Sequence, residues 1–267
     1  MLITIPLLTA LILAAIYPLC FWIGHKDPLK NDFHKFHIGF PNCVGGVAVV
    51  GMLFMPLPLF LKAAAVLWKT ILISISYFYW KKTTVNPLAI TIPCLMGIFV
   101  FFAVLIELVV LPLTQGANTV GVTPIIFSGI LGGGVLCSSL YTMNLGHWYL
   151  NVHGLPVIHL KRAVYVFWFF LLVRALWDSY MILTAHVFSQ GESISLLKFL
   201  GNMDGFFLSI AFFFGTLFPM VSLWFVKGTL DVKSTQSATG ILYVILSAVL
   251  IGDITYKYYL IRYGLGL

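Results

Sequence analysis

Eight long apolar stretches constrain the fold of this chain more than any other feature of its sequence. A bilayer core about 30 Å thick is spanned by about 20 apolar residues in a helix, and each stretch is close to that length. Only 9% of the 267 residues are charged, against about a quarter in soluble domains. We therefore expect an all-α, polytopic transmembrane helical bundle built from Leu2–Gly24, Gly39–Phe60, Ala63–Trp80, Leu88–Leu113, Gly121–Met143, Ala163–Phe188, Met203–Val226 and Thr239–Ile261.

Basic residues alternate between the connections of these eight helices. With the N-terminus outside, the outer connections carry only Lys62 and Lys198. The positive-inside rule then predicts a multi-pass protein of the cell membrane, specifically the bacterial cytoplasmic membrane, with the N-terminus and the C-terminus both outside. We find no repeat or linker and expect a single domain over 1–267. The inner connections would carry Lys26, Lys30, Lys35, Lys81, Lys82, Lys161, Arg162, Lys227 and Lys233.

Charge and cysteine content exclude several classes of function. The net charge is +7, but the basic residues stand singly or in pairs between apolar stretches, so we expect no nucleic-acid partner. The four cysteines are isolated and form no CxxC or CxxCH spacing, which excludes disulfide scaffolds, c-type haem attachment and cysteine-ligated clusters.

Several charged residues fall inside the predicted helices, where insertion of each costs at least about 2.5 kcal/mol. Arg174 and Asp178 are four residues apart, as are Asp253 and Lys257, so each pair faces one side of its helix. For Arg174 with Asp178, neutralisation by pairing and a role in ligand or proton handling are both open. We count a rise of about 1.5 Å per residue from the predicted outer end of each helix. This count places five charged residues in the outer half of the bilayer: Lys69, Glu107, Arg174, Asp178 and Asp253.

Glu107 differs from these residues because its own predicted helix contains no basic residue. It either pairs with Lys69 or another helix, or has a raised pKa. Proton-coupled redox proteins and transporters use carboxyl groups of that kind. We therefore predict that Glu107, Arg174 and Asp178 handle protons.

Histidines form a second cluster, with six of the seven on the predicted inner side. Imidazole carries protons near neutral pH and binds metals, so an inner interfacial site for a metal or a quinone headgroup is one interpretation. Interfacial hydrogen bonding and an aromatic belt are the other. We predict ligand binding by His147, Trp148, Tyr149 and His153.

The spacing of the histidines argues against bound metals. A haem b site needs two histidines at similar depth on facing helices, and only His186 lies well inside a predicted helix. We therefore expect no intrinsic haem and no metal site. A membrane di-iron lipid-modifying enzyme is suggested by His34-x-x-His37, but the chain has no His-His doublet and too few histidines for its ligand shell.

The helix count and the last segment carry a family resemblance. The stretch from Ser234 to Tyr243, followed by Asp253 and a tyrosine-rich end, is similar to quinone-interacting membrane anchor subunits of the NrfD and polysulfide-reductase type. No family motif is matched residue by residue, so no family site is carried over. The resemblance implies a subunit of an electron-transfer complex that lies in membrane lipid, binds quinone and relies on other subunits carrying redox cofactors. The alternative is a small-solute or proton-coupled transporter or channel, which would use the same buried charges.

Overall fold

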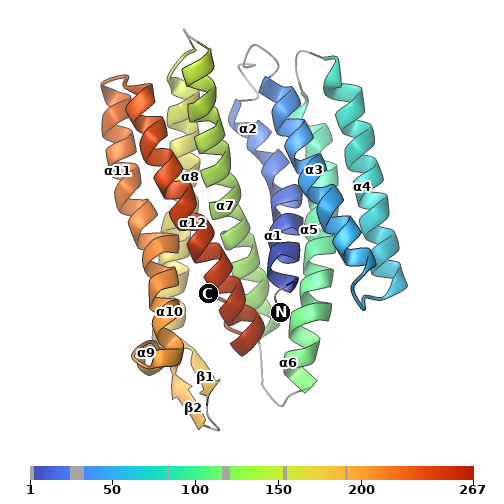
Figure 1. Cartoon of the computed structure of the whole chain (residues 1–267), viewed down its shortest axis with the longest axis vertical. Helices are drawn as coiled ribbons and strands as arrows, with labels where there is room; N and C mark the ends of the chain where they lie inside the picture. The colour runs from blue at the N-terminus through green and yellow to red at the C-terminus, as the bar shows by residue number, and fades with distance from the viewer. Residues whose placement is uncertain (1–2, 25–32, 83–84, 116–120, 153–154, 190–191) are drawn as a thin grey trace. The chain divides into compact units, whose positions relative to one another are not determined.

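The computed structural model confirms an all-α polytopic fold, and it describes residues 3–24, 33–82, 85–115, 121–152, 155–189 and 192–267 (Figure 1). Within these residues, eight helical segments are long and apolar enough to cross a membrane. In such segments every backbone polar group is satisfied inside the helix, which is why an apolar chain of this kind folds as helices. The orientation of the termini stays a prediction. The helices form two compact units, residues 2–108 and 109–267, and the expected single domain over 1–267 also stays a prediction.

Four spans make up the unit of residues 2–108. The first span packs against the second and the fourth, and the third also packs against the second and the fourth. Pro58 precedes the third span as its N-cap, and the chain leaves helical geometry between the second and third spans. The elements are α1 Thr4–Ile16, the 3-10 turn η1 Tyr17–Cys20, α2 Phe21–Gly24, α3 Phe33–Leu53, α4 Leu59–Trp80, α5 Pro87–Leu105 and the first part of the π-helical turn η2 Ile106–Val110.

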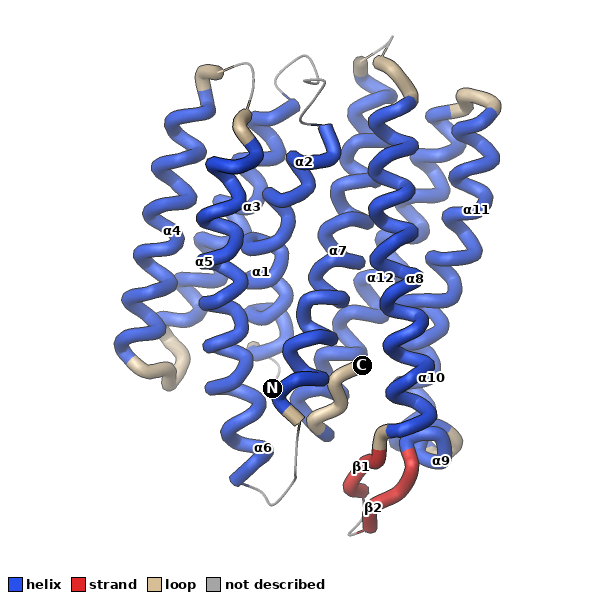
Figure 2. The backbone as a smooth tube through the Cα atoms, turned by 180° about the vertical axis from the view of Figure 1, so that it is seen from behind, coloured by secondary structure: helices blue, strands red, loops and turns tan. Residues whose placement is uncertain are grey.

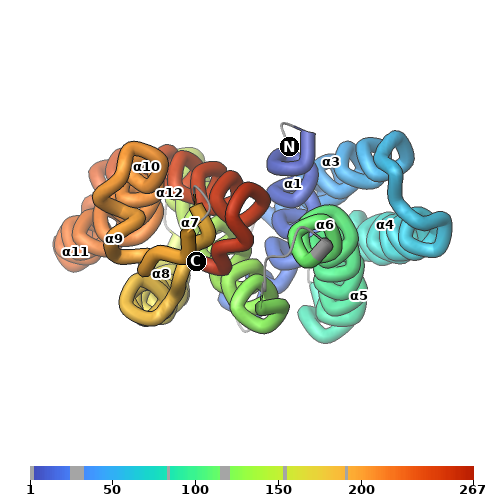
Figure 3. Tube along the Cα trace, turned by 90° about the horizontal axis from the view of Figure 1, so that it is seen from below, coloured from blue at the N-terminus to red at the C-terminus, as the bar shows by residue number. Residues whose placement is uncertain are grey.

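The other four spans form a ring in the unit of residues 109–267. Helix α7 packs against α8 and α12, and α11 packs against the same two helices, as the end-on view shows (Figure 3). The elements are the end of η2, α6 Leu111–Gln115, α7 Val122–Asn151, α8 Ile158–Thr184, β1 His186–Ser189, β2 Glu192–Ser195, α9 Leu196–Leu200, α10 Met203–Phe212, the π-helical turn η3 Phe213–Leu217, α11 Phe218–Asp231 and α12 Thr235–Tyr263.

A short hairpin interrupts the helical pattern after α8. Strands β1 and β2 pair antiparallel, with His186 opposite Ser195, and α9 follows directly (Figure 2). The prediction that Ala163–Phe188 is one helix is therefore wrong at its end, and His186 lies on a strand. Ala185 already has extended backbone geometry, so the helix ends at Thr184.

Helix α7 is longer than the sequence suggested. The predicted boundary at Met143 is wrong, because the helix continues to Asn151. His147, Trp148 and Tyr149 therefore lie on the last turns of a helix and not in a connecting loop.

Candidate functional site

A buried ion pair on α8 forms the centre of the candidate site. Arg174 and Asp178 are one helical turn apart, and their side chains are 3% and 0% exposed. Arg174 Nε lies 2.9 Å from Asp178 Oδ1, but this N–H does not point at the oxygen, so the contact is an ion pair without an aligned hydrogen bond. The pairing predicted from the spacing of four is confirmed, and the attraction between the two charges offsets part of the cost of burying them.

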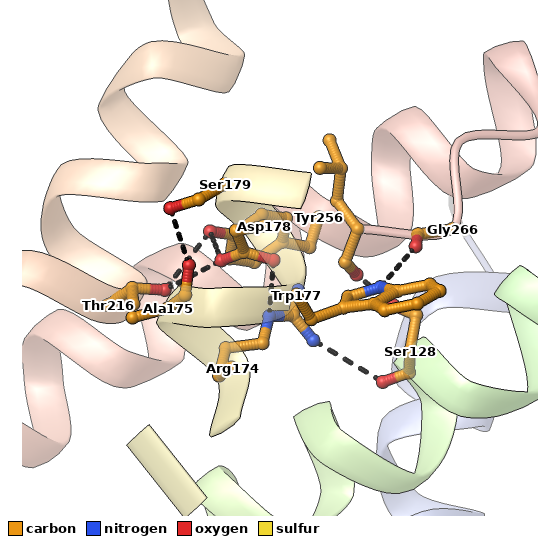
Figure 4. Close-up of polar contacts among 10 residues, drawn as sticks. Ser128, Arg174, Ala175, Trp177, Asp178, Ser179, Thr216, Tyr256 and Gly266 are labelled. Carbon is orange, nitrogen blue, oxygen red and sulfur yellow. Dashed lines mark hydrogen bonds and ion pairs between the residues drawn. The ribbon is translucent and has the colours of Figure 1, made fainter. Parts of the chain in front are cut away.

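The second oxygen of Asp178 belongs to a triangle with two hydroxyl groups (Figure 4). Tyr256 on α12 donates to Asp178 Oδ2 at 2.7 Å, and Thr216 donates to the same oxygen at 3.0 Å. The two hydroxyl oxygens are 3.2 Å apart. All three oxygens are therefore within hydrogen-bond distance of one another, and the three residues are buried.

Thr216 reaches this carboxylate from a π-helical turn. Turn η3 inserts wider i to i+5 geometry into the span that begins with α10 and continues as α11. Gly215, next to Thr216, lies directly against Gly252 of α12, because a Cβ added at Gly252 would be 2.3 Å from the Gly215 Cα. The two glycines thus let the two backbones meet at the level of the carboxylate.

The guanidinium of Arg174 has further partners on neighbouring helices. Its Nη1 donates to the backbone oxygen of Ser128 on α7 at 3.3 Å, and its Cζ lies 4.1 Å from the centre of the Tyr256 ring. Its Nη2 is buried and makes no hydrogen bond to the described residues. One donor of the site therefore remains available to a proton acceptor or ligand.

A second ion pair adjoins the first. Lys257 donates to both carboxylate oxygens of Asp253, one turn earlier on α12, and both residues are buried. Gly132 on α7 separates the two pairs, because a Cβ there would lie 3.3 Å from Arg174 Nη1 and 3.8 Å from Asp253 Oδ1. With two cations and two anions, the ionised set is neutral, which lets it stay buried in a low-dielectric bundle.

The last residues described pack over one side of the site. Trp177 donates to the Gly266 oxygen at 2.8 Å, and the Ser128 hydroxyl donates to the Leu267 oxygen. Leu265 and Leu267 are both buried. Since Ser128 also accepts from Arg174 through its backbone oxygen, this segment shares a contact residue with the ion pair.

Glu107 belongs to the other unit, on the π-helical turn η2, and it is partly exposed. It makes no hydrogen bond or ion pair within the described chain. The pair with Lys69 is not formed, because Lys69 donates to Asn42 Oδ1 at 2.7 Å and also to the Asn42 backbone oxygen. The grouping of Glu107 with Arg174 and Asp178 stays a prediction, since Glu107 lies outside their unit.

The predicted ligand-binding residues lie at the C-terminal end of α7. His147 is exposed, and its Nδ1 lies 2.9 Å from the Tyr243 hydroxyl of α12. Trp148 is partly buried beside it, and buried Tyr149 donates to the Pro156 backbone oxygen. His153 lies outside the described residues. The structure therefore adds Tyr243 to this cluster, a residue that the sequence pattern did not single out.

No three His, Cys, Asp or Glu side chains among the described residues are placed to hold a metal ion. The absence of a metal or haem stays a prediction. His34 and His37, which suggested a di-iron enzyme, both lie buried on α3, and His37 Nδ1 is 2.7 Å from the Tyr17 hydroxyl.

Comparison with known protein families, with curated proteins and with solved structures finds no match. The resemblance to anchor subunits of the NrfD type therefore stays a prediction, and the chemistry of the buried residues is the basis for a functional proposal.

The geometry around Lys69 changes what is expected of Glu107 variants. Glu107→Gln is expected to leave the melting temperature in detergent unchanged, because no described partner loses an interaction.

Asn42→Leu, by contrast, should lower the free energy of unfolding by about 1–3 kcal/mol, because it removes the side-chain oxygen that accepts a hydrogen bond from Lys69. If Glu107→Gln were destabilising and Lys69→Met restored the loss, a Lys69–Glu107 pair would exist after all.

Proposed function

We propose that this protein is a membrane subunit that conducts protons through the unit of residues 109–267, in a quinone-linked electron-transfer complex. The observation that carries the proton-conducting role is the triangle formed by Asp178, Tyr256 and Thr216. Both hydroxyls donate to the ionised carboxylate. When the carboxylate takes up a proton, a hydroxyl can turn and donate to its neighbour at 3.2 Å. Protons can thus be rearranged without moving the backbone.

The quinone part of the proposal rests on the resemblance and on the His147 cluster. A quinone headgroup needs a hydrogen-bond donor for its carbonyl oxygen and a flat apolar neighbour. An exposed imidazole bonded to the Tyr243 phenol, whose ring centre lies 6.3 Å from that of the imidazole, meets both needs. Membrane lipid surrounds the spans, and we propose the bacterial cytoplasmic membrane and partner subunits carrying the redox cofactors.

Gentle purification tests the assignment to a complex. We expect other subunits to co-purify, identified by mass spectrometry, with an absorbance spectrum of iron–sulfur or haem groups. Proton-coupled transport is the second candidate, because a transporter would use the same buried charges, and the π-helical turns η2 and η3 would suit functional sites of either kind. A lone, colourless protein that moves protons in liposomes would support transport instead.

Tyr256→Phe tests the triangle directly. It removes one transferable proton and leaves all four charges of the site in place. We expect quinone-linked proton uptake by proteoliposomes that contain the purified complex, followed with an internal pH-sensitive dye, to fall about 100-fold or more, while stability falls by only about 1 kcal/mol.

Tyr258→Phe on the same helix is the matched control, because Tyr258 is exposed and outside the triangle. It should leave proton uptake unchanged. Unaltered uptake in Tyr256→Phe would make the triangle a purely structural network and remove the observation on which the proposal rests.

A further inference from the structure

A groove lies between α11 and α12, away from the buried charges. Its volume is about 620 Å³, and Trp224, Phe225, Lys227, Gly228, Asp231 and Ile241 are among its lining residues. Gly228 has no neighbouring atom within 4 Å of where a Cβ would lie, so the groove is open at that point. It therefore has room for part of another molecule.

The walls of the groove are apolar and face away from the helix ring. Trp224 is 67% exposed and Phe225 is 62% exposed, although both belong to a membrane span. In a soluble protein such a patch would suggest another protein, but in a spanning helix it faces acyl chains. Trp224 also lies near the end of its span, where tryptophan is enriched at the lipid headgroup level.

The charges at the end of the groove sum to a net positive value. Asp231, at the end of α11, forms an ion pair with Lys161 of α8 at 2.7 Å. Lys227 is exposed one turn earlier, and its Nζ lies 5.8 Å from the centre of the Trp224 ring. Two lysines thus face one carboxylate, which leaves one positive charge beside an apolar groove.

We propose that this groove binds one anionic phospholipid, with its phosphate at Lys227 and an acyl chain along Trp224 and Phe225. Charge complementarity selects an anion, and the exposed aromatic walls require an apolar tail on that anion. A zwitterionic lipid would fill the same groove without selectivity. The inference is independent of the proposed proton path, since none of the groove residues belongs to the triangle.

Fluorescence quenching of the full chain in vesicles tests the site. Two kinds of vesicle are compared, both made mainly of unmodified phosphatidylcholine. One contains a small fraction of phosphatidylglycerol brominated on its acyl chains, and the other contains the same fraction of phosphatidylcholine brominated in the same way. All seven tryptophans of the chain contribute to the fluorescence. The difference in quenching between the unmodified chain and Trp224→Phe is therefore the signal that reports lipid in the groove. We expect the brominated phosphatidylglycerol to associate about fivefold more strongly than the brominated phosphatidylcholine, as one lysine near an anionic headgroup provides.

Lys227→Gln should bring this ratio close to one, and Lys227→Arg should keep it, because the charge is preserved. Lys81→Gln is the control, an exposed lysine of the other unit, and should leave the ratio at its original value. Equal association of the two lipids with the unmodified chain, or selectivity that survives Lys227→Gln, overturns the proposal. Absence of any Trp224 quenching would also overturn it, since the groove would then be covered by protein.

Discussion

Asp178→Asn is expected to destabilise the protein far more than Arg174→Met, although both break the same ion pair. Asparagine leaves the Arg174 guanidinium buried at 3% exposure without its paired carboxylate, and the set of two cations and two anions keeps one uncompensated positive charge. Arginine keeps its proton under all ordinary conditions, so the site cannot relieve this charge by titration. Removing one partner of a buried pair in this way costs about 3–5 kcal/mol.

Arg174→Met leaves the Asp178 carboxylate without its counter-charge, but two effects can still stabilise this group. It keeps the hydrogen bonds from Tyr256 and Thr216, and it can take up a proton and become neutral. We therefore expect a loss of only about 1–3 kcal/mol. In the double variant no buried charge is left from this pair, so its loss should be smaller than the sum of the two single losses.

The unmodified chain, the two single variants and the double variant form a double-mutant cycle. Their unfolding in detergent by denaturant or heat, followed by circular dichroism, measures this cycle. The exposed pair of Lys161 and Asp231 provides the control, because its side chains are 31% and 55% exposed. Asp231→Asn should leave the stability close to that of the unmodified chain. A loss for Asp178→Asn as small as that of the control, or strict additivity of the two single variants, would mean that the charges are not held together as described.

The features of this fold that are visible in the sequence follow from the bilayer. Spanning segments must be apolar and about 20 residues long, so their existence and type are readable residue by residue. The pairing of Arg174 with Asp178 is readable for a similar reason, since a spacing of four places two side chains on one helix face.

The partners of Asp178 on other helices are not readable in this way. Thr216 reaches the site through the π-helical turn η3, which shifts the helical phase, and nothing in the surrounding apolar residues marks the shift. The partner of Lys69 could not be predicted from the sequence either, because an ammonium group can donate to any oxygen. Here Asn42 provides both a backbone and a side-chain oxygen, and Gly46 leaves room for the Lys69 stem, whose Cε would lie 3.7 Å from a Cβ at that position.

Gly252→Ala is expected to disturb the site without changing any of its polar residues. A Cβ at this position would lie 2.3 Å from the Gly215 Cα and 2.7 Å from the Gly215 nitrogen. Backbone atoms cannot turn aside as a side chain can, so η3 and α12 must move apart. Overpacking of this kind typically costs about 1–3 kcal/mol, and we expect the upper end of this range because both neighbours are backbone.

The displacement also separates the two sides of the triangle. Thr216 follows Gly215 on η3, and Tyr256 lies one turn beyond Gly252 on α12. Because both hydroxyls donate to the same oxygen of Asp178, moving the two backbones apart lengthens at least one of these two hydrogen bonds. Proton uptake in liposomes should therefore fall together with stability, although the carboxylate and both hydroxyls are retained.

Gly240→Ala on the same helix is the matched control for this change. No atom lies within 4 Å of the Cβ position at Gly240, and alanine favours helix over glycine by about 1 kcal/mol. The control should thus be as stable as the unmodified chain or slightly more stable, with normal proton uptake. If Gly252→Ala behaved like Gly240→Ala in both measurements, the close approach of η3 and α12 would not exist in the membrane, and Thr216 could not be assigned to the carboxylate of Asp178.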